Sequence, residues 1–145
     1  MTGEFPNTED YNDLKNELNA RSEITPEMIK FIKSLPKETG PTVQLSNCLL
    51  QLQRNSRFAK GYAEGINKNA YWEMCYEDCM DILAKMPHLA AYIYRHTYKN
   101  DDLISPNPNL DWAGNFAHML GLNSLEAREL FRGYLSVFRY FSPLL

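Results

Sequence analysis

Apolar residues recur along this chain mainly at intervals of three and four, the spacing that places side chains on one face of an α-helix. The first apolar stripe consists of Tyr11, Leu14 and Leu18. Asn7 or Thr8 would cap its helix, because short polar side chains accept hydrogen bonds from the first free amides. A second stripe consists of Met28, Ile29, Ile32 and Leu35. Thr25 would cap that helix, with Pro26 at its first position, and Pro36 would end it.

A third helix would begin at Gly40–Pro41, and the loop-rich stretch at 55–69 that follows would hold one short helix. The longest apolar pattern comes next and runs from residue 71 to residue 98. Its apolar residues follow the a/d spacing of a coiled coil: Trp72, Cys75, Cys79, Ile82, Met86, Leu89 and Ile93. Pro87 lies inside the pattern, which continues in phase beyond it, so a kink is expected there instead of a break. A seam of this length predicts a partner helix along the whole face.

Two further helices are expected after a loop at residues 99–109. Asn109 would cap the first, which passes through Trp112, and Gly121 would end it. Asn123, with Glu126 three residues later, would start the second. The last helix would contain Leu130, Phe131, Tyr134, Val137 and Phe138. No stretch alternates between apolar and polar residues for long enough to predict a strand, so the expected fold is all-α, with about six to seven helices.

The composition narrows the classes of function. With 145 residues and 44% hydrophobic content the chain can form one domain with a core. A net charge of -3 argues against nucleic acid as a partner, and no apolar run approaches the ~20 residues that span a bilayer. The apolar tail at 138–145 could be considered as a membrane anchor, but it has one positive charge and a proline, so no membrane partner is expected. Three cysteines do not indicate a disulfide framework.

The residues that could support chemistry have ordinary explanations as well. Cys75 and Cys79 lie at helical spacing and could share a metal with His88 or His96, but their place in the apolar seam favours buried small side chains and no metal. Three carboxylates precede the middle of the same helix, and a solvated face explains them better than acid–base catalysis: Glu77, Asp78 and Asp81. Lys60 and Lys68 lie beside glycines and could meet an anion or be surface lysines. Periodicity and spacing predict no catalytic residue.

The stretch from Arg57 to Arg95, "RFAKGYAEGINKNAYWEMCYEDCMDILAKMPHLAAYIYR", and the later "NLDWAGNFAHMLG" resemble the large helical domain of mitochondrial-type citrate synthase. Upstream, "TGEFPNTEDYNDL" and "LPKETGPTVQLSNCLLQLQ" resemble the preceding helices of that family. The resemblance extends in order over residues 2 to about 137. It implies that residues 1–137 are part of the citrate synthase large domain and that 138–145 are an apolar tail without counterpart in the family.

The resemblance implies an acyltransferase that condenses acetyl-CoA with oxaloacetate and water to give citrate and CoA, in the mitochondrial matrix, as a homodimer. It also implies that the family's catalytic aspartate and histidines fall outside residues 1–145, because the chain ends with "FRYFSPLL" where the family has His-x-Asp-His-Glu-Gly-Gly-Asn. Lys68 in "GINKN" matches a basic residue, arginine in the mitochondrial enzymes, that contacts the phosphate end of CoA. CoA or acetyl-CoA is therefore the implied ligand, as a substrate and not as a permanent cofactor.

Two functional hypotheses follow. In the first, the chain is an incomplete citrate synthase, cut at both ends and without a transit peptide, that supplies scaffold and one CoA contact and is inactive alone. In the second, it is a non-catalytic helical module that associates with full-length citrate synthase subunits.

Overall fold

The computed structural model describes residues 6–141, the last six of them by their backbone alone. Within this range the chain forms seven α-helices and no strand, which confirms the all-α prediction. The helices are α1 (Thr8–Arg21), α2 (Pro26–Ser34), α3 (Pro41–Leu52), α4 (Arg57–Ala63), α5 (Tyr71–Tyr94), α6 (Trp112–Met119) and α7 (Leu125–Phe141). Two 3-10 turns, η1 (Gln53–Asn55) and η2 (Lys68–Ala70), flank α4, and a π-helical turn, η3 (Arg95–Lys99), continues α5.

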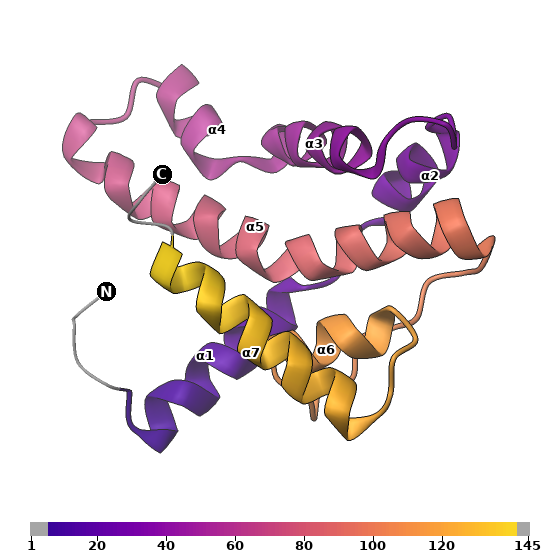
Figure 1. Cartoon of the computed structure of the whole chain (residues 1–145). Coiled ribbons are helices and arrows are strands. Elements are labelled where there is room, and N and C mark those ends of the chain that lie inside the picture. Colours follow the sequence, from indigo (N-terminus) through magenta and orange to yellow (C-terminus); the bar gives the residue numbers. More distant parts are fainter. Residues whose placement is uncertain (1–5, 142–145) are drawn as a thin grey trace.

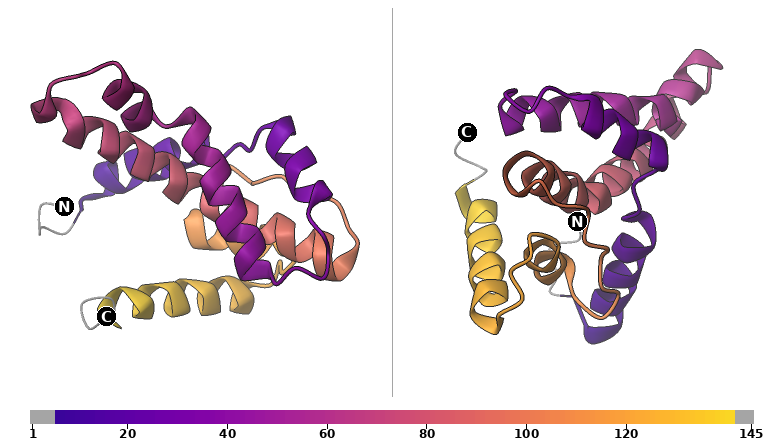
Figure 2. Two further views of the ribbon diagram at one scale, coloured as in Figure 1. Left: turned by 90° about the horizontal axis from the view of Figure 1, so that it is seen from above. Right: turned by 90° about the vertical axis from the view of Figure 1, so that its right-hand side faces the viewer.

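The long helix α5 lies in the middle of the molecule, with α3 and α4 along one side and α1, α6 and α7 on the other (Figure 1). Figure 2 shows the same arrangement from two further directions. The helix is continuous through Pro87, as expected of a pattern that keeps its phase. Because α5 contacts α1, α3, α4 and α6, it is the element that positions the rest.

Helix starts follow the expected chemistry where the polar cap stands directly before the apolar stripe. Asn7 and Asp10 form a capping box at α1, and the Thr25 hydroxyl accepts a hydrogen bond from the amide of Met28 at α2. Gly121, at φ 88, ends the α6 segment through hydrogen bonds from its own amide to His118 and from the Leu122 amide to Ala117.

Two predicted caps were wrong by one or two residues. The α6 cap is Asp111 and not Asn109, because residues 107–110 form a turn in which the Asn109 amide donates to the Asn107 side chain. At α7 the Ser124 hydroxyl accepts from the Ala127 amide, while the side chain of Asn123 bonds to the ring of His118. In both cases the structure uses a neighbouring polar residue that has the same capping chemistry.

The main core lies where α2 and α3 pack against the second half of α5. Its buried members are Ile24, Met28, Ile32, Cys48, Leu89, Tyr92 and Ile93. Enclosure of Cys48 raises the pKa of its thiol to about 11, so this cysteine behaves as a small apolar side chain. A smaller cluster joins Leu18 of α1 to Met80 and Ala84 of α5.

The predicted a/d seam of α5 is covered only in its second half. Leu89 and Ile93 are 0% and 2% exposed, but Trp72 is 67% exposed, and Cys75 and Cys79 also face solvent. The expectation that these two cysteines are buried was therefore wrong. The reason is that the helices packed on the first half of α5 contact other faces of it, including Met80 and Ala84.

The outer helices also leave predicted apolar positions exposed. Tyr11 and Leu14 of the α1 stripe are 48% and 47% exposed, and Leu130 and Tyr134 of α7 are 70% and 60% exposed. Val137 and Phe138 lie outside the residues whose side chains are described. None of the described helices is both long enough and apolar enough to span a bilayer.

Candidate functional site

Lys68, the one ligand residue that the sequence pointed to, begins the short turn η2 between α4 and α5. Gly65 adopts φ 75 after α4, a backbone conformation that glycine adopts without strain, and Asn67 fixes the next bend by accepting a hydrogen bond from the Asn69 amide at 2.9 Å. Lys68 is exposed, and its ammonium makes no hydrogen bond or ion pair with the described residues. The turn therefore presents a free positive charge to solvent.

The helix before this turn is packed closely on α5. A Cβ added at Gly61 would lie 2.5 Å from the Met74 sulfur and 3.2 Å from Ile66 Cδ1, so only glycine allows this approach without rearrangement. Phe58, Tyr62 and Tyr71 form a cluster with ring centroids 5.3 to 6.1 Å apart. These contacts hold the Lys68 turn in a defined place beside the start of α5.

Asp78 of α5 fixes the other end of α4. Its carboxylate accepts hydrogen bonds from the Ser56 hydroxyl at 2.5 Å, the Arg57 amide at 2.8 Å and the Phe58 amide at 3.1 Å. Burial by itself raises the pKa of Asp78, but these hydrogen bonds and the charge of Arg57 outweigh it and hold the pKa below its ordinary value. An ionised carboxylate at the start of α4 also interacts favourably with the helix dipole.

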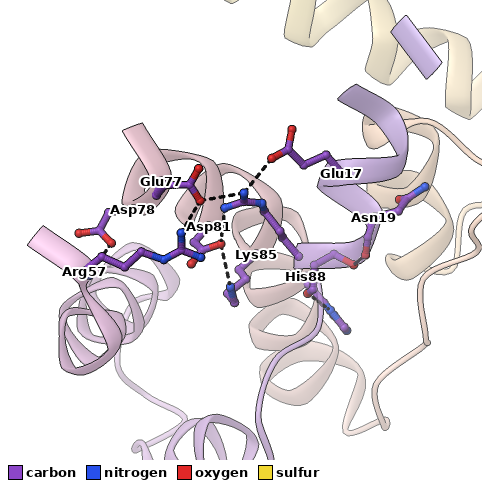
Figure 3. Close-up of polar contacts among 10 residues, drawn as sticks. Glu17, Asn19, Arg57, Glu77, Asp78, Asp81, Lys85 and His88 are labelled. Atoms are coloured by element: carbon purple, nitrogen blue, oxygen red, sulfur yellow. Dashed lines mark hydrogen bonds and ion pairs between the residues drawn. The ribbon is translucent and has the colours of Figure 1, made fainter. Parts of the chain in front are cut away.

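A network of ion pairs centred on Arg21 ties α1 to α5 (Figure 3). The guanidinium lies 2.7 Å from Glu17, 2.8 Å from Glu77 and 3.1 Å from Asp81, and hydrogen bonding to Glu77 is the largest effect that raises its pKa. Arg57 of α4 reaches Glu77 at 2.5 Å. The network thus connects three helices.

The three carboxylates of α5 therefore form neither an acid–base pair nor a simple solvated face, and the latter expectation was wrong. Glu77 and Asp81 are ion-pair partners that are 29% and 32% exposed, and Asp78 caps α4. Sequence reasoning missed Arg21 and Ser56 because their partners are 22 to 60 residues away along the chain. The only local signals were a basic residue in the last turn of α1 and a serine before α4.

The structure does not assemble the metal ligands that were considered. Cys75 and Cys79 are exposed on α5, whereas His88 is buried further along the helix and bonds to the Ser22 carbonyl. His96 lies in η3 beside the ring of Tyr92. Across residues 6–141 no three histidine, cysteine or carboxylate side chains are grouped as metal ligands would be.

The sequence model of the family described as "Citrate synthase, C-terminal domain" matches residues 1–138. The chain belongs to the citrate synthase family. The mitochondrial citrate synthase of Tetrahymena thermophila is 46% identical over 138 residues, which cover 94% of this chain and 30% of that protein. That of Daucus carota is 41% identical over 137 residues, 94% of this chain and 29% of the relative. The chain thus spans about 30% of the length of these citrate synthases.

The fold comparison agrees with this assignment. The crystal structure of citrate synthase from Pyrobaculum aerophilum matches with a TM-score of 0.73 and 24% identity, over 87% of this chain and 32% of that one. The resemblance seen in the sequence is confirmed at the level of family and fold. The related citrate synthases include mitochondrial ones and a peroxisomal one from Saccharomyces cerevisiae, 36% identical over 94% of this chain and 30% of that protein.

Proposed function

We propose that this chain is part of the large helical domain of a citrate synthase, the acyltransferase that condenses acetyl-CoA with oxaloacetate and water to give citrate and CoA. The observation that supports this most strongly is the similarity of 94% of the chain to mitochondrial citrate synthases at up to 46% identity. The central position of α5, with α4 fixed on it by Asp78, suits a scaffold that positions ligand-binding turns.

Within this function, Lys68 contacts the phosphate end of CoA or acetyl-CoA. Its charge has no internal partner among the described residues, and its turn is anchored on both sides by α4 and α5. A lysine supplies a point charge but not the planar fork of arginine, so the contact with phosphate is looser than an arginine would make. The charge therefore contributes to binding and to no chemical step.

Residues 1–145 hold none of the side chains that the family resemblance assigns to enolisation of the thioester or to activation of the oxaloacetate carbonyl. The 145-residue chain alone is therefore expected to show no citrate synthase activity. The test is oxaloacetate-dependent release of CoA from acetyl-CoA by the purified chain. Activity that survives repeated purification would contradict the expectation.

The CoA contact is tested separately, by NMR of the 145-residue chain during titration with CoA. Amide signals of residues 66–70 should shift with CoA but not with pantetheine, which lacks the phosphates. Lys68→Ala should remove the shifts, Lys68→Arg should retain them, and Lys60→Ala, a change of an exposed lysine on α4, should leave them intact. Equal shifts with pantetheine, or full shifts in Lys68→Ala, would refute a phosphate contact.

Association with a second citrate synthase subunit, as a homodimer or with a full-length subunit, is the proposed partner interaction. Trp72, on the uncovered half of the α5 seam, is 67% exposed, and Tyr76 and Leu83, which lie beside the seam on the same helix, are 54% and 43% exposed. Exposed apolar side chains grouped in this way promote association. Sedimentation of the chain should show an oligomer that Trp72→Glu weakens, with Glu73→Gln as the control. A monodisperse monomer would contradict this interaction.

We place the protein in the mitochondrial matrix by analogy with its relatives, which imaging of the tagged protein would test.

A further inference from the structure

His88 lies on α5 beneath the segment that connects α1 to α2, and it is 4% exposed. Its Nδ1 is 3.0 Å from the Ser22 carbonyl oxygen. A carbonyl oxygen only accepts hydrogen bonds, so Nδ1 must carry the proton and donate. In the neutral ring Nε2 is then an acceptor, and it is buried without a hydrogen-bond partner among the described residues. The side chain in Figure 3 points away from the ion pairs of Arg21.

The surroundings of this ring accommodate the neutral form and not the charged one. Burial is the largest influence and keeps the pKa of His88 below its ordinary value near 6.5, while the Ser22 hydrogen bond and the charge of Glu23 act in the opposite direction. Protonation would place a second N–H on Nε2, which has no hydrogen-bond partner among the side chains that the structure describes, residues 6–135. An unpaired buried charge is strongly disfavoured.

The other charged groups near His88 on the helices around it form ion pairs with residues other than His88. Arg21 at the end of α1 pairs with acids of α1 and α5, and Lys85, one turn earlier on α5, lies 3.9 Å from Asp81. Helix α3 contains no charged residue, and Asp111, the cap of α6, pairs with Arg132. Glu23 is therefore the acid whose charge acts on a protonated ring, and its effect is smaller than that of burial.

The contacts that hold α1 are concentrated at the end where His88 lies. Leu18 is the buried residue of this helix, and Asn19 bonds to the Pro108 carbonyl at 3.3 Å and to Asn115 at 3.2 Å. The Ser22 hydroxyl donates to the Asn19 carbonyl at 2.7 Å, so the backbone that accepts from His88 is continuous with these contacts. The first half of α1 is exposed. Loss of the contact at Ser22 would consequently weaken the docking of the whole helix.

We propose that His88 is an acid-sensitive latch that holds the C-terminal end of α1 on α5 while its ring is neutral and releases α1 when the ring is protonated. The released ring takes up a proton near its ordinary pKa of 6.5, whereas the enclosed ring does so only at lower pH. Docking of α1 is therefore strongest above this ordinary value and weakens as the pH falls toward the lower pKa of the docked state. In that interval the opening equilibrium rises up to about tenfold per pH unit.

The test is amide hydrogen exchange on the 145-residue chain between about pH 7.5 and about pH 5.5, corrected for the intrinsic pH dependence of exchange. Protection of α1 should fall with acid by up to about tenfold per pH unit, while protection of α3 around Cys48 changes less. His88→Asn should remove the acid dependence of α1, because an amide can still donate to the Ser22 carbonyl but does not titrate. His118→Asn, at a half-buried histidine in the last turn of α6, is the matched control and should retain it.

Nitrogen-15 spectra of the histidine rings provide a second readout, and at neutral pH His88 should show a proton on Nδ1. The proposal is overturned if α1 is unprotected at about pH 7.5, if its acid dependence persists in His88→Asn, or if α1 and α3 lose protection in parallel. The last outcome would locate the acid sensitivity in general unfolding, to which His96 contributes, since burial and the charge of Lys37 lower its pKa.

Discussion

Removal of the Asp78 carboxylate by Asp78→Ala should release α4, and with it the turn that presents Lys68. Asp78 accepts three hydrogen bonds, from the Ser56 hydroxyl and from the Arg57 and Phe58 amides, at 2.5 to 3.1 Å. A hydrogen bond to a charged group contributes about 1.5 kcal/mol or more, and an anion at a helix N-terminus about 0.5 kcal/mol. Because the three bonds converge on one carboxylate and do not add, and because the Ser56 hydroxyl still accepts from the Ala59 amide at the start of α4, we expect a net cost of about 2 kcal/mol.

The assay is exchange of the amides of α4, together with urea unfolding at neutral pH. Asp78→Ala should raise the opening equilibrium of α4 about 30-fold, the equivalent of 2 kcal/mol. Asp81→Ala is the matched control, since it removes a carboxylate from the same helix whose ion pairs at 3.1 and 3.9 Å are partly exposed and contribute at most about 1 kcal/mol. Equal effects of the two substitutions on α4 would refute the capping role.

The same prediction has a defined pH dependence. The folded protein holds the pKa of Asp78 below its ordinary value, so the carboxylate stabilises the fold above the ordinary value of 3.8 and loses this effect as the pH falls through the lower folded pKa. The difference in unfolding free energy between wild type and Asp78→Ala should therefore be largest near neutral pH and should shrink with acid. A difference that grows below about pH 4 would contradict the assignment.

Leu89→Ala, at a side chain with no exposure, should lower the unfolding free energy by about 3 kcal/mol, whereas Leu50→Ala, at 72% exposure, should change it by less than about 0.5 kcal/mol in the same denaturation experiment. Gly133→Ala should stabilise the protein by about 0.5 kcal/mol in urea unfolding, because a Cβ there meets no atom within 4 Å and alanine favours helix. Asp111→Asn should lower the melting temperature at neutral pH but progressively less in acid. Hydrogen bonds from Arg132, at 2.7 and 3.0 Å, are the main cause of the low pKa of Asp111, and their effect is lost as the carboxylate protonates.

Helix positions could be predicted because their signals are short-range. A capping residue and the three residues after it suffice to start a helix, and Asn7 and Thr25 were assigned on that basis. Where two polar residues stood within two positions, as at Asn109 and Asp111, the choice depended on a turn that involves Asn107. The position of Lys68 in a turn between α4 and α5 was also predictable, because Gly61 and Gly65, which precede it, mark that break.

The candidate site was harder to predict from the sequence, because the residues that hold it in place come from distant parts of the chain. Ser56 and Asp78 are 22 residues apart, and Arg21 and Asp81 are 60 apart, so no local pattern pairs them. The resemblance to citrate synthases is the basis for the proposal that Lys68 contacts CoA, and the structure shows what holds its turn in place.

Local sequence was sufficient for the all-α class, for the long helix and for most helix ends, since periodicity and capping act within one or two turns. It could not show which face of α5 would be covered: the same heptad seam holds Leu89 in the core and leaves Trp72 in solvent. Burial depends on which helices pack nearby, and that is decided by the tertiary fold. The enclosed ring of His88 and the cap formed by Asp78 have the same origin, because both require residues far apart in sequence to meet across a helix interface.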